Sequence, residues 1–151
     1  MSATSQSPAS QLCTFYLDNQ MFGIDVQSVQ EVIRYQQMTD IPLAPDSVCG
    51  LINLRGQIVT AIELRKRLGL PNRPEGQLPM NVVVRSDDGA VSLLVDQIGD
   101  VQESDEENFE PPPETLRGST RQLIRGAYKM KDRLLLVLDT ERVIDVTSNV
   151  D

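Results

Sequence analysis

The chain carries the same pattern of apolar and acidic residues twice, and this duplication constrains its fold more than any other feature. The pattern Val26-x-x-Val29-x-Glu31-Val32 returns 69 residues further on, from position 26 to position 95, as Val95-x-x-Ile98-x-Asp100-Val101. A second pair of similar segments, 61–65 and 137–141, begins at positions 76 residues apart. Each half is predicted to contain a hairpin, a turn, a strand, a long loop, a second hairpin and a short helix. The alternative is a chance similarity between two apolar β-patterns.

Alternating apolar residues and turn signals predict a mainly β protein. Apolar residues make up 40% of the chain but aromatic residues only 4%, so Val, Ile and Leu must fill the core. Five short strands in each half suit a small closed barrel, which leaves no sheet edge exposed. We therefore expect two similar small five-stranded β-barrels (SH3-like) packed together. The expected strands are 12–17, 21–26, 31–35, 49–54, 57–62, 80–85, 90–95, 98–102, 122–129 and 133–138, with short helices over 63–68 and 139–146.

The domain organisation follows from composition. Residues 1–10 are polar and are predicted to form a disordered tail. Residues 11–147 form a single domain with barrel subdomains at about 11–70 and 80–139, and the helix at about 139–146 packs back on them. Residues 71–79 have the composition of a linker. Each barrel has about 60 residues and is marginal alone, so the two must share buried surface.

Charge argues against a nucleic-acid or anionic-membrane partner. The chain has 14 basic and 22 acidic residues, a net charge of −8, whereas phosphate binding needs Lys and Arg. A single-stranded nucleic-acid binder built on small barrels also needs stacking aromatics, and six aromatic residues make that alternative poor. Residues 96–114 contain acidic side chains but no Lys or Arg, and we expect a long solvated loop there.

Catalytic chemistry has no sequence basis in this chain. The absence of histidine excludes Ser-His-Asp and Cys-His arrangements. No phosphate-binding glycine motif occurs. Cys13 and Cys49 lie far apart in apolar surroundings and are expected to be buried free thiols. We therefore predict that the protein is not an enzyme and has no cofactor or metal site.

Arg55 is the leading candidate for a binding residue, because it occupies a tight turn beside Gly56 between two apolar runs. A guanidinium presented there can bind a partner's carboxylate or carbonyl, and the alternative is an ordinary exposed turn residue. Glu31 is either a binding residue or an exposed strand position, and Val29 is either a contact or simple core. The basic residues Arg117, Arg121, Arg125 and Lys129 recur at four-residue steps and are expected to form a solvated strand edge.

Several short segments together form a specific pattern. The most specific is Gly50-Leu51-Ile52-Asn53-Leu54-Arg55-Gly56, and the others are 22–26, 29–33, 41–45, 62–65, 94–96 and 136–139. With these segments the chain resembles the CheW family, the coupling proteins of bacterial chemotaxis, from about residue 11 to residue 146. It departs from the usual family pattern at Thr60, where proline is common, at Glu63, where aspartate is common, and at Ser92, where glycine is common.

The resemblance implies two intertwined five-stranded barrels and a non-catalytic adaptor. Such adaptors bind the regulatory domain of a CheA-type histidine kinase through apolar barrel ends. They bind the cytoplasmic tip of methyl-accepting chemoreceptors through the groove between the barrels. Matched residue by residue, Val29, Glu31 and Arg55 fall on receptor-binding positions, as do Ile98 and Val101 in the second half. The kinase-contact residues are not identified by this match.

The expected location is the cytoplasm, with recruitment to membrane receptor arrays but no direct membrane insertion. The first ten residues lack the basic start and apolar stretch of a signal peptide, and no run approaches the roughly 20 apolar residues of a membrane span. The alternative function is the same adaptor module in another chemosensory-like array, such as one for twitching motility.

Overall fold

The computed structural model describes residues 11–87, 89–104, 106–116 and 118–146. The predicted disordered tail, residues 1–10, lies outside the described residues. The first half contains β1 (Gln11–Leu17), β2 (Gln20–Asp25), the 3-10 turn η2 (Val26–Ser28), β3 (Val29–Ile33), β4 (Val48–Leu54), β5 (Gln57–Glu63) and α1 (Leu64–Arg67). The second half contains β6 (Met80–Ser86), β7 (Gly89–Val95), β8 (Gln97–Glu103), the 3-10 turn η3 (Glu106–Asn108), β9 (Phe109–Glu110), α2 (Gly118–Leu123), β10 (Ile124–Lys129), β11 (Leu134–Leu138) and α3 (Thr140–Ile144).

The predicted fold class is confirmed: the protein is mainly β, with short helices that include one near the C-terminus. Two local expectations were wrong. The strand expected over 122–129 begins only at Ile124, because residues 118–123 form α2. The loop expected after the predicted strand 98–102 is not continuous, because η3 and β9 fall within it, whereas the strand itself is present as β8.

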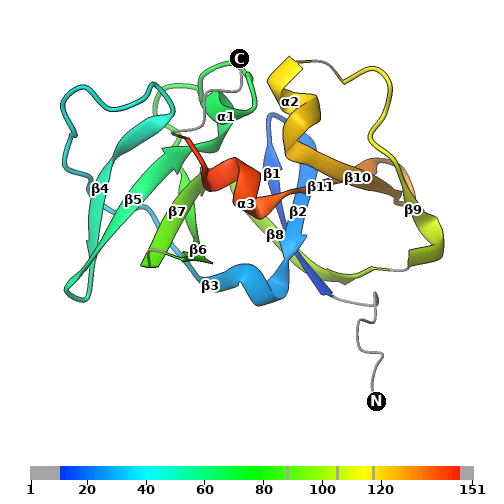
Figure 1. The fold of residues 1–151 in the computed structure, drawn as a ribbon, viewed down its shortest axis with the longest axis horizontal. Helices are drawn as coiled ribbons and strands as arrows, with labels where there is room; N and C mark the ends of the chain where they lie inside the picture. The colour runs from blue at the N-terminus through cyan, green and yellow to red at the C-terminus, as the bar shows by residue number, and fades with distance from the viewer. Residues whose placement is uncertain (1–10, 88, 105, 117, 147–151) are drawn as a thin grey trace.

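The strands form two mixed sheets that lie side by side (Figure 1). Sheet A has the order β8-β1-β2-β11-β10-β9, and sheet B has the order β3-β6-β7-β5-β4. Each sheet contains one parallel pair, β2 with β11 and β5 with β7, and parallel neighbours require a long crossover. Each sheet therefore takes strands from both halves of the sequence, and the sheets do not coincide with residues 11–70 and 80–139.

A single large apolar cluster joins the two sheets. It includes Phe15 and Leu17 from sheet A, Val82 and Leu93 from sheet B, and Val143 from α3. Two smaller clusters, one around Met21 and Leu135 and one around Val59 and Val83, each belong to one sheet. Because a strand alternates its side chains between two faces, each sheet packs one face against the shared cluster and the other against its own.

The segment after β3 closes sheet B between its two edge strands. Thr39 and Leu51 exchange backbone hydrogen bonds of 2.8 Å, so the chain leaving β3 pairs with β4. A Cβ at Gly50 would lie 2.6 Å from the carbonyl oxygen of Thr39, closer than packed atoms allow. Glycine at position 50 is therefore what permits this close approach.

Helix α3 is fixed between the two halves of the chain. Asp139 caps its first turn by accepting a hydrogen bond from the Arg142 amide. Arg67, at the end of α1, donates to the carbonyl oxygens of Val143, Arg142 and Asp145 at distances of 2.9, 2.7 and 3.2 Å. The three carbonyls lie in the last turn of α3 and just after it, where a helix has too few amide donors for its carbonyls, so α1 anchors α3.

We expect that a fragment of residues 80–151 does not fold alone. It would lack β1 to β5, which supply the partners of β6, β7, β8 and β11 and half of the shared cluster. Thermal melting followed by circular dichroism should show no cooperative transition, whereas the full chain should melt cooperatively. A sharp, reversible melt of the fragment would contradict the shared core.

Candidate functional site

Arg55 adopts a backbone conformation that few non-glycine residues adopt. It occupies the first position of the two-residue turn between β4 and β5, where Leu54 pairs with Gln57. The φ angles of Arg55 and Gly56 are +53° and +90°, as a type I′ turn requires, and such turns strongly prefer Asn, Asp or Gly. The Asn53 carboxamide accepts a hydrogen bond from the Gly56 amide at 2.9 Å and supports the turn. An arginine held in this strained position indicates a role for its side chain.

The Arg55 guanidinium forms an ion pair and a hydrogen bond with Glu31 on β3. The Arg55 side chain is 71% exposed and that of Glu31 is 22% exposed, so the pair faces solvent. The hydrogen bond from Arg55 lowers the pKa of Glu31, and the same bond raises the pKa of Arg55. Both groups therefore stay charged, and most guanidinium N–H groups remain available to a ligand.

A β-bulge separates Val29 from Glu31 in space. Val29 pairs with Val84 but Glu31 pairs with Val83, so two residues of β3 correspond to one step of β6. Residues two apart on a strand normally share a face, yet Val29 packs against the shared cluster while Glu31 lies on the face of Val83. Val29 and Glu31 therefore do not form one contiguous patch.

A second bulge, on β8, brings two of the predicted residues onto one face instead of separating them. Phe15 pairs with Ile98 and Cys13 with Val101, so Gly99 and Asp100 stand opposite the single residue Thr14. The Thr14 hydroxyl donates to the Asp100 carbonyl, and a Cβ at Gly99 would lie 2.5 Å from the Thr14 Oγ1 atom. The bulge places Ile98 and Val101 on one face. Ile98 packs against the shared cluster, whereas Val101 is 53% exposed.

The structure thus divides the five predicted receptor residues into two groups. Glu31 and Arg55 form an exposed charged pair on sheet B. Val29 and Ile98 both pack against the shared cluster, with Val101 exposed beside Ile98 on β8. No contact given by the structure joins the charged pair to the apolar group among the described residues.

A groove of about 830 Å³ lies between sheet B and α3. Its apolar lining includes Ile58 and Ile62 of β5, Val91 of β7, and Ile144 of α3. The polar side chain of Ser28, on η2, also lines the groove. Among the described residues, the five predicted receptor positions do not line this groove, although Ser28 immediately precedes Val29. The groove combines aliphatic walls with the charged side chains Arg85, Asp87, Glu141 and Asp145.

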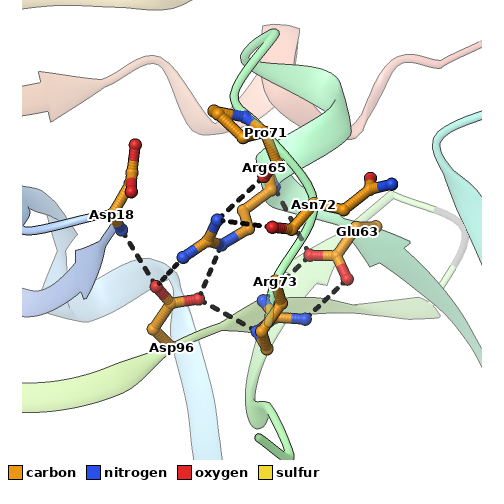
Figure 2. Close-up of polar contacts among 7 residues, drawn as sticks. All are labelled: Asp18, Glu63, Arg65, Pro71, Asn72, Arg73 and Asp96. Atoms are coloured by element: carbon orange, nitrogen blue, oxygen red, sulfur yellow. Dashed lines mark hydrogen bonds and ion pairs between the residues drawn. The ribbon is translucent and has the colours of Figure 1, made fainter. Parts of the chain in front are cut away.

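A buried ionic cluster surrounds Asp96, as Figure 2 shows. Asp96 accepts hydrogen bonds from Arg65 Nε at 3.0 Å and Arg65 Nη2 at 2.6 Å, a paired geometry that suits guanidinium and carboxylate. It also accepts from Arg73 Nε at 3.0 Å and from the Asp18 amide at 2.9 Å. Burial alone would raise the pKa of Asp96, but these hydrogen bonds lower it below its ordinary value.

The cluster contains equal numbers of positive and negative charges. Arg73 also donates to both carboxylate oxygens of Glu63, at 2.7 and 3.0 Å. Arg65 Nη1 donates to the carbonyl oxygens of Pro71 and Asn72, so the side chain is fully engaged. Burial lowers the pKa of Arg73, but its bonds with Glu63 and Asp96 outweigh that effect and raise it. The segment 71–79, which has the composition of a linker, is therefore fastened at its start.

Sequence reasoning did not identify this cluster. Asp96 was assigned with the solvated acidic stretch, but its side chain is only 8% exposed because two arginines enclose it. Arg65 and Asp96 each directly follow a buried run, which is a weak signal for a buried ion pair. Arg73 lies in a Pro- and Gly-containing segment, and its sequence context gives no signal.

The remaining candidates have modest roles in the structure. Cys13 is buried and Cys49 is half-buried, and both are free thiols. Burial raises the pKa of Cys13, and burial together with Glu63 raises the pKa of Cys49 to about 11.

Arg121 lies on α2 rather than on a strand edge and donates to the Pro113 carbonyl. Arg117 lies outside the described residues. Among the described residues, no group of three or more His, Cys, Asp or Glu side chains could hold a metal ion.

The fold defines a class of protein: a mainly β module of two sheets built on a shared apolar core. The family model of the CheW-like domain matches residues 11–148. The chain is 31% identical over 137 residues to a chemotaxis protein CheW of Treponema pallidum, covering 88% of this chain and 81% of that protein. It is 30% identical over 138 residues to a chemotaxis protein CheW of Bacillus subtilis, covering 91% and 88%.

A solved structure gives the same result. The scaffolding protein TtCheW of Thermoanaerobacter tengcongensis superposes with a TM-score of 0.81 at 28% identity, covering 95% of this chain and 97% of that chain. The chain belongs to the CheW family, the non-catalytic scaffold proteins of chemotaxis signalling. None of the helices in the described ranges has the length and apolar character that a membrane crossing needs.

We expect Asp96→Asn to destabilise the fold by about 3 kcal/mol, because removing one partner of a buried ion pair leaves the other charges uncompensated. The midpoint of thermal unfolding should fall by roughly 10 °C in a chain of this size. Asp132→Asn is the matched control, since Asp132 is exposed and 3.8 Å from the Nε atom of Arg133. Equal effects of the two substitutions would contradict the proposed importance of the cluster.

The same cluster predicts a dependence of stability on pH. Because the folded-state pKa of Asp96 is lower than its ordinary value of 3.8, its contribution is fully present above that value and is lost as the pH falls through the folded-state pKa. Urea unfolding at pH 7, 5, 4 and 3 should show that the wild type loses more stability below pH 4 than Asp96→Asn does. If the free energy of unfolding falls equally in the two proteins between pH 5 and pH 3, Asp96 is not the source of the acid sensitivity.

Proposed function

We propose that this chain couples the cytoplasmic tips of methyl-accepting chemoreceptors to the regulatory domain of a CheA-type histidine kinase, and that it does so in the cytoplasm. The observation that best supports this is the exposed Arg55–Glu31 pair, built on a strained turn at a position that the family resemblance links to receptor binding. Membership of a scaffold family supports the adaptor role. In an adaptor, the two partners must occupy different surfaces at the same time.

The receptor surface proposed here is centred on Arg55. A receptor tip is a helical hairpin whose turn and flanks present carbonyls and polar side chains. A planar guanidinium binds such acceptors with two parallel hydrogen bonds, which lysine cannot reproduce. Glu31 holds the guanidinium in place without burying it. Ile98 and Val101 offer apolar contact on the second sheet.

The kinase surface proposed here lies at the other end of β4. Leu43 is fully exposed, with a φ angle of +61° between two prolines at positions 42 and 45. Eleven residues, 44–54, separate Leu43 from Arg55, and seven of them form β4, a strand that spans roughly 20 Å. In Figure 1 the segment between β3 and β4 runs from the bottom of sheet B to its top left, where β4 begins, and the β4–β5 turn lies at the bottom. Exposed aliphatic groups of this kind favour association by apolar burial.

Arg55→Glu should abolish receptor binding and leave kinase binding nearly intact. The substitution reverses the charge offered to receptor carbonyls and carboxylates, while the melting temperature should stay close to that of the wild type because exposed ion pairs contribute little. Arg55→Lys should be intermediate. The measurement is a pair of binding assays on each purified variant, one with a receptor fragment and one with the kinase regulatory domain.

Arg125→Glu is the matched control, because Arg125 is an exposed arginine on β10 of the other sheet and the change in charge is identical. It should keep both affinities. If Arg55→Glu lowers both affinities together, or lowers neither, Arg55 is not the selective receptor contact.

Leu43→Glu should have the reciprocal effect. A charge placed at the centre of an apolar contact should weaken kinase binding by at least about tenfold, with receptor binding unchanged. Leu78→Glu is the matched control, since Leu78 is also exposed but lies in the segment 71–79. Kinase affinity that survives Leu43→Glu would place the kinase contact elsewhere.

A further inference from the structure

A buried polar pair lies inside sheet B, away from the surfaces described above. The Ser92 hydroxyl on β7 donates to the Asn81 Oδ1 atom on β6 at 2.7 Å. The Asn81 Nδ2 atom in turn donates to the carbonyl oxygen of Arg34, directly after β3, at 3.0 Å. Ser92 and Asn81 are 0% and 1% exposed. The pair therefore links two central strands to the backbone of the chain that leaves β3.

This link reaches the segment that closes sheet B. Ile33 and Met38, on either side of the tethered carbonyl, pack against the cluster of Val59 and Val83. Thr39 then makes its two hydrogen bonds with Leu51 on β4. Leu43 follows four residues later. The tether at Arg34 thus holds the start of the segment whose far end carries Leu43.

The Arg34 carbonyl determines which way the Asn81 amide points, because a carbonyl only accepts hydrogen bonds, and the Ser92 hydroxyl then pairs with the amide oxygen. An amide has one oxygen and one nitrogen at its end. With the hydroxyl donating to Oδ1, the NH₂ group faces the Arg34 carbonyl. Without the hydroxyl, Oδ1 loses its donor in a buried site, which is costly, and the reversed amide would place two acceptors together.

We propose that the Ser92–Asn81 pair is a positioning device that holds residues 34–39 against β4 and thereby presents Leu43 to the kinase. This rests on the proposed kinase surface. Neither side chain touches the partner. Both act through the Arg34 carbonyl and the Thr39–Leu51 bridge.

The test compares Ser92→Ala with the double variant Asn81→Leu/Ser92→Ala in the full chain. The single variant leaves a buried amide oxygen unpaired and should lower the melting temperature. In the double variant both side chains of the pair become apolar, which removes the unpaired amide oxygen, but the Arg34 carbonyl loses its donor and the tether is missing. Native-state hydrogen exchange of the Thr39 and Leu51 amides should be about tenfold faster than in the wild type in the double variant, with a smaller increase in Ser92→Ala, which keeps the bond from Asn81 to the Arg34 carbonyl. Kinase affinity should fall several-fold in the double variant. Thr120→Val, which removes a hydroxyl bond to the Leu68 carbonyl in another part of the molecule, is the control and should change neither readout.

The outcomes separate this inference from the proposed function. Unchanged exchange at Thr39 and Leu51 in the double variant would overturn the positioning role. A second outcome would also overturn the positioning role. In it, the Thr39 and Leu51 amides exchange faster but kinase affinity is unchanged, although Leu43→Glu has lost kinase binding. The proposed kinase surface would then stand without the tether. Loss of receptor binding together with kinase binding would show general destabilisation and would also count against the positioning role. If Leu43→Glu itself binds kinase normally, the proposed kinase surface fails, and the exchange rates then decide whether the tether exists.

Discussion

The ion cluster around Asp96 is the constraint on which the arrangement of the two sheets depends. Asp96 stands between β7 of sheet B and β8 of sheet A, and its carboxylate binds the Asp18 amide in the β1–β2 turn as well as Arg65 after β5. The point where the chain passes from one sheet to the other is therefore held by charge-assisted hydrogen bonds. A buried ion pair adds little stability compared with a well-packed apolar group, but its bond directions fix geometry, which apolar contacts do not.

Much of the fold could be predicted from the sequence because strands and turns are local. The Arg55–Gly56 turn signals a hairpin through residues that adopt positive φ, and Asp87-Asp88-Gly89 is a strong hairpin signal in the sequence. The partners of the strands could not be predicted in this way. The apolar alternation of β2 is equally compatible with a neighbour from either half, and its parallel pairing with β11 depends on contacts more than a hundred residues apart. Likewise, α2 follows a proline-rich stretch with little apolar periodicity, which leaves no helical signal.

The geometry around the predicted site residues could not be predicted from the sequence. The hairpin turn at Arg55 follows from local sequence, whereas its contact with Glu31 requires sheet B to bring β3 near the β4–β5 turn. The faces of Val29 and Val101 depend on bulges, and a bulge shifts every later side chain by one position. Gly99 is a sequence signal for the second bulge, because a glycine inside a strand often marks a bulge. Gln30, within the first bulge, gives none.

A shared core suits a scaffold for a physical reason. If each sheet had its own core and only a flexible connection, two partners bound to different parts of the molecule could reorient freely, and the state of one would have little influence on the other. Here both sheets bury one face in the same cluster, so rotating one against the other would expose Phe15, Leu93 and their neighbours to water. Exposing apolar area costs about 25 cal/mol per Å², so a reorientation that uncovers a few hundred Å² is unfavourable by several kcal/mol. The proposed contacts at Arg55 and Leu43 lie at the two ends of β4, which is itself part of this body. A receptor and a kinase held there would keep a fixed mutual orientation, so the scaffold can pass a displacement from one partner to the other without changing its own fold.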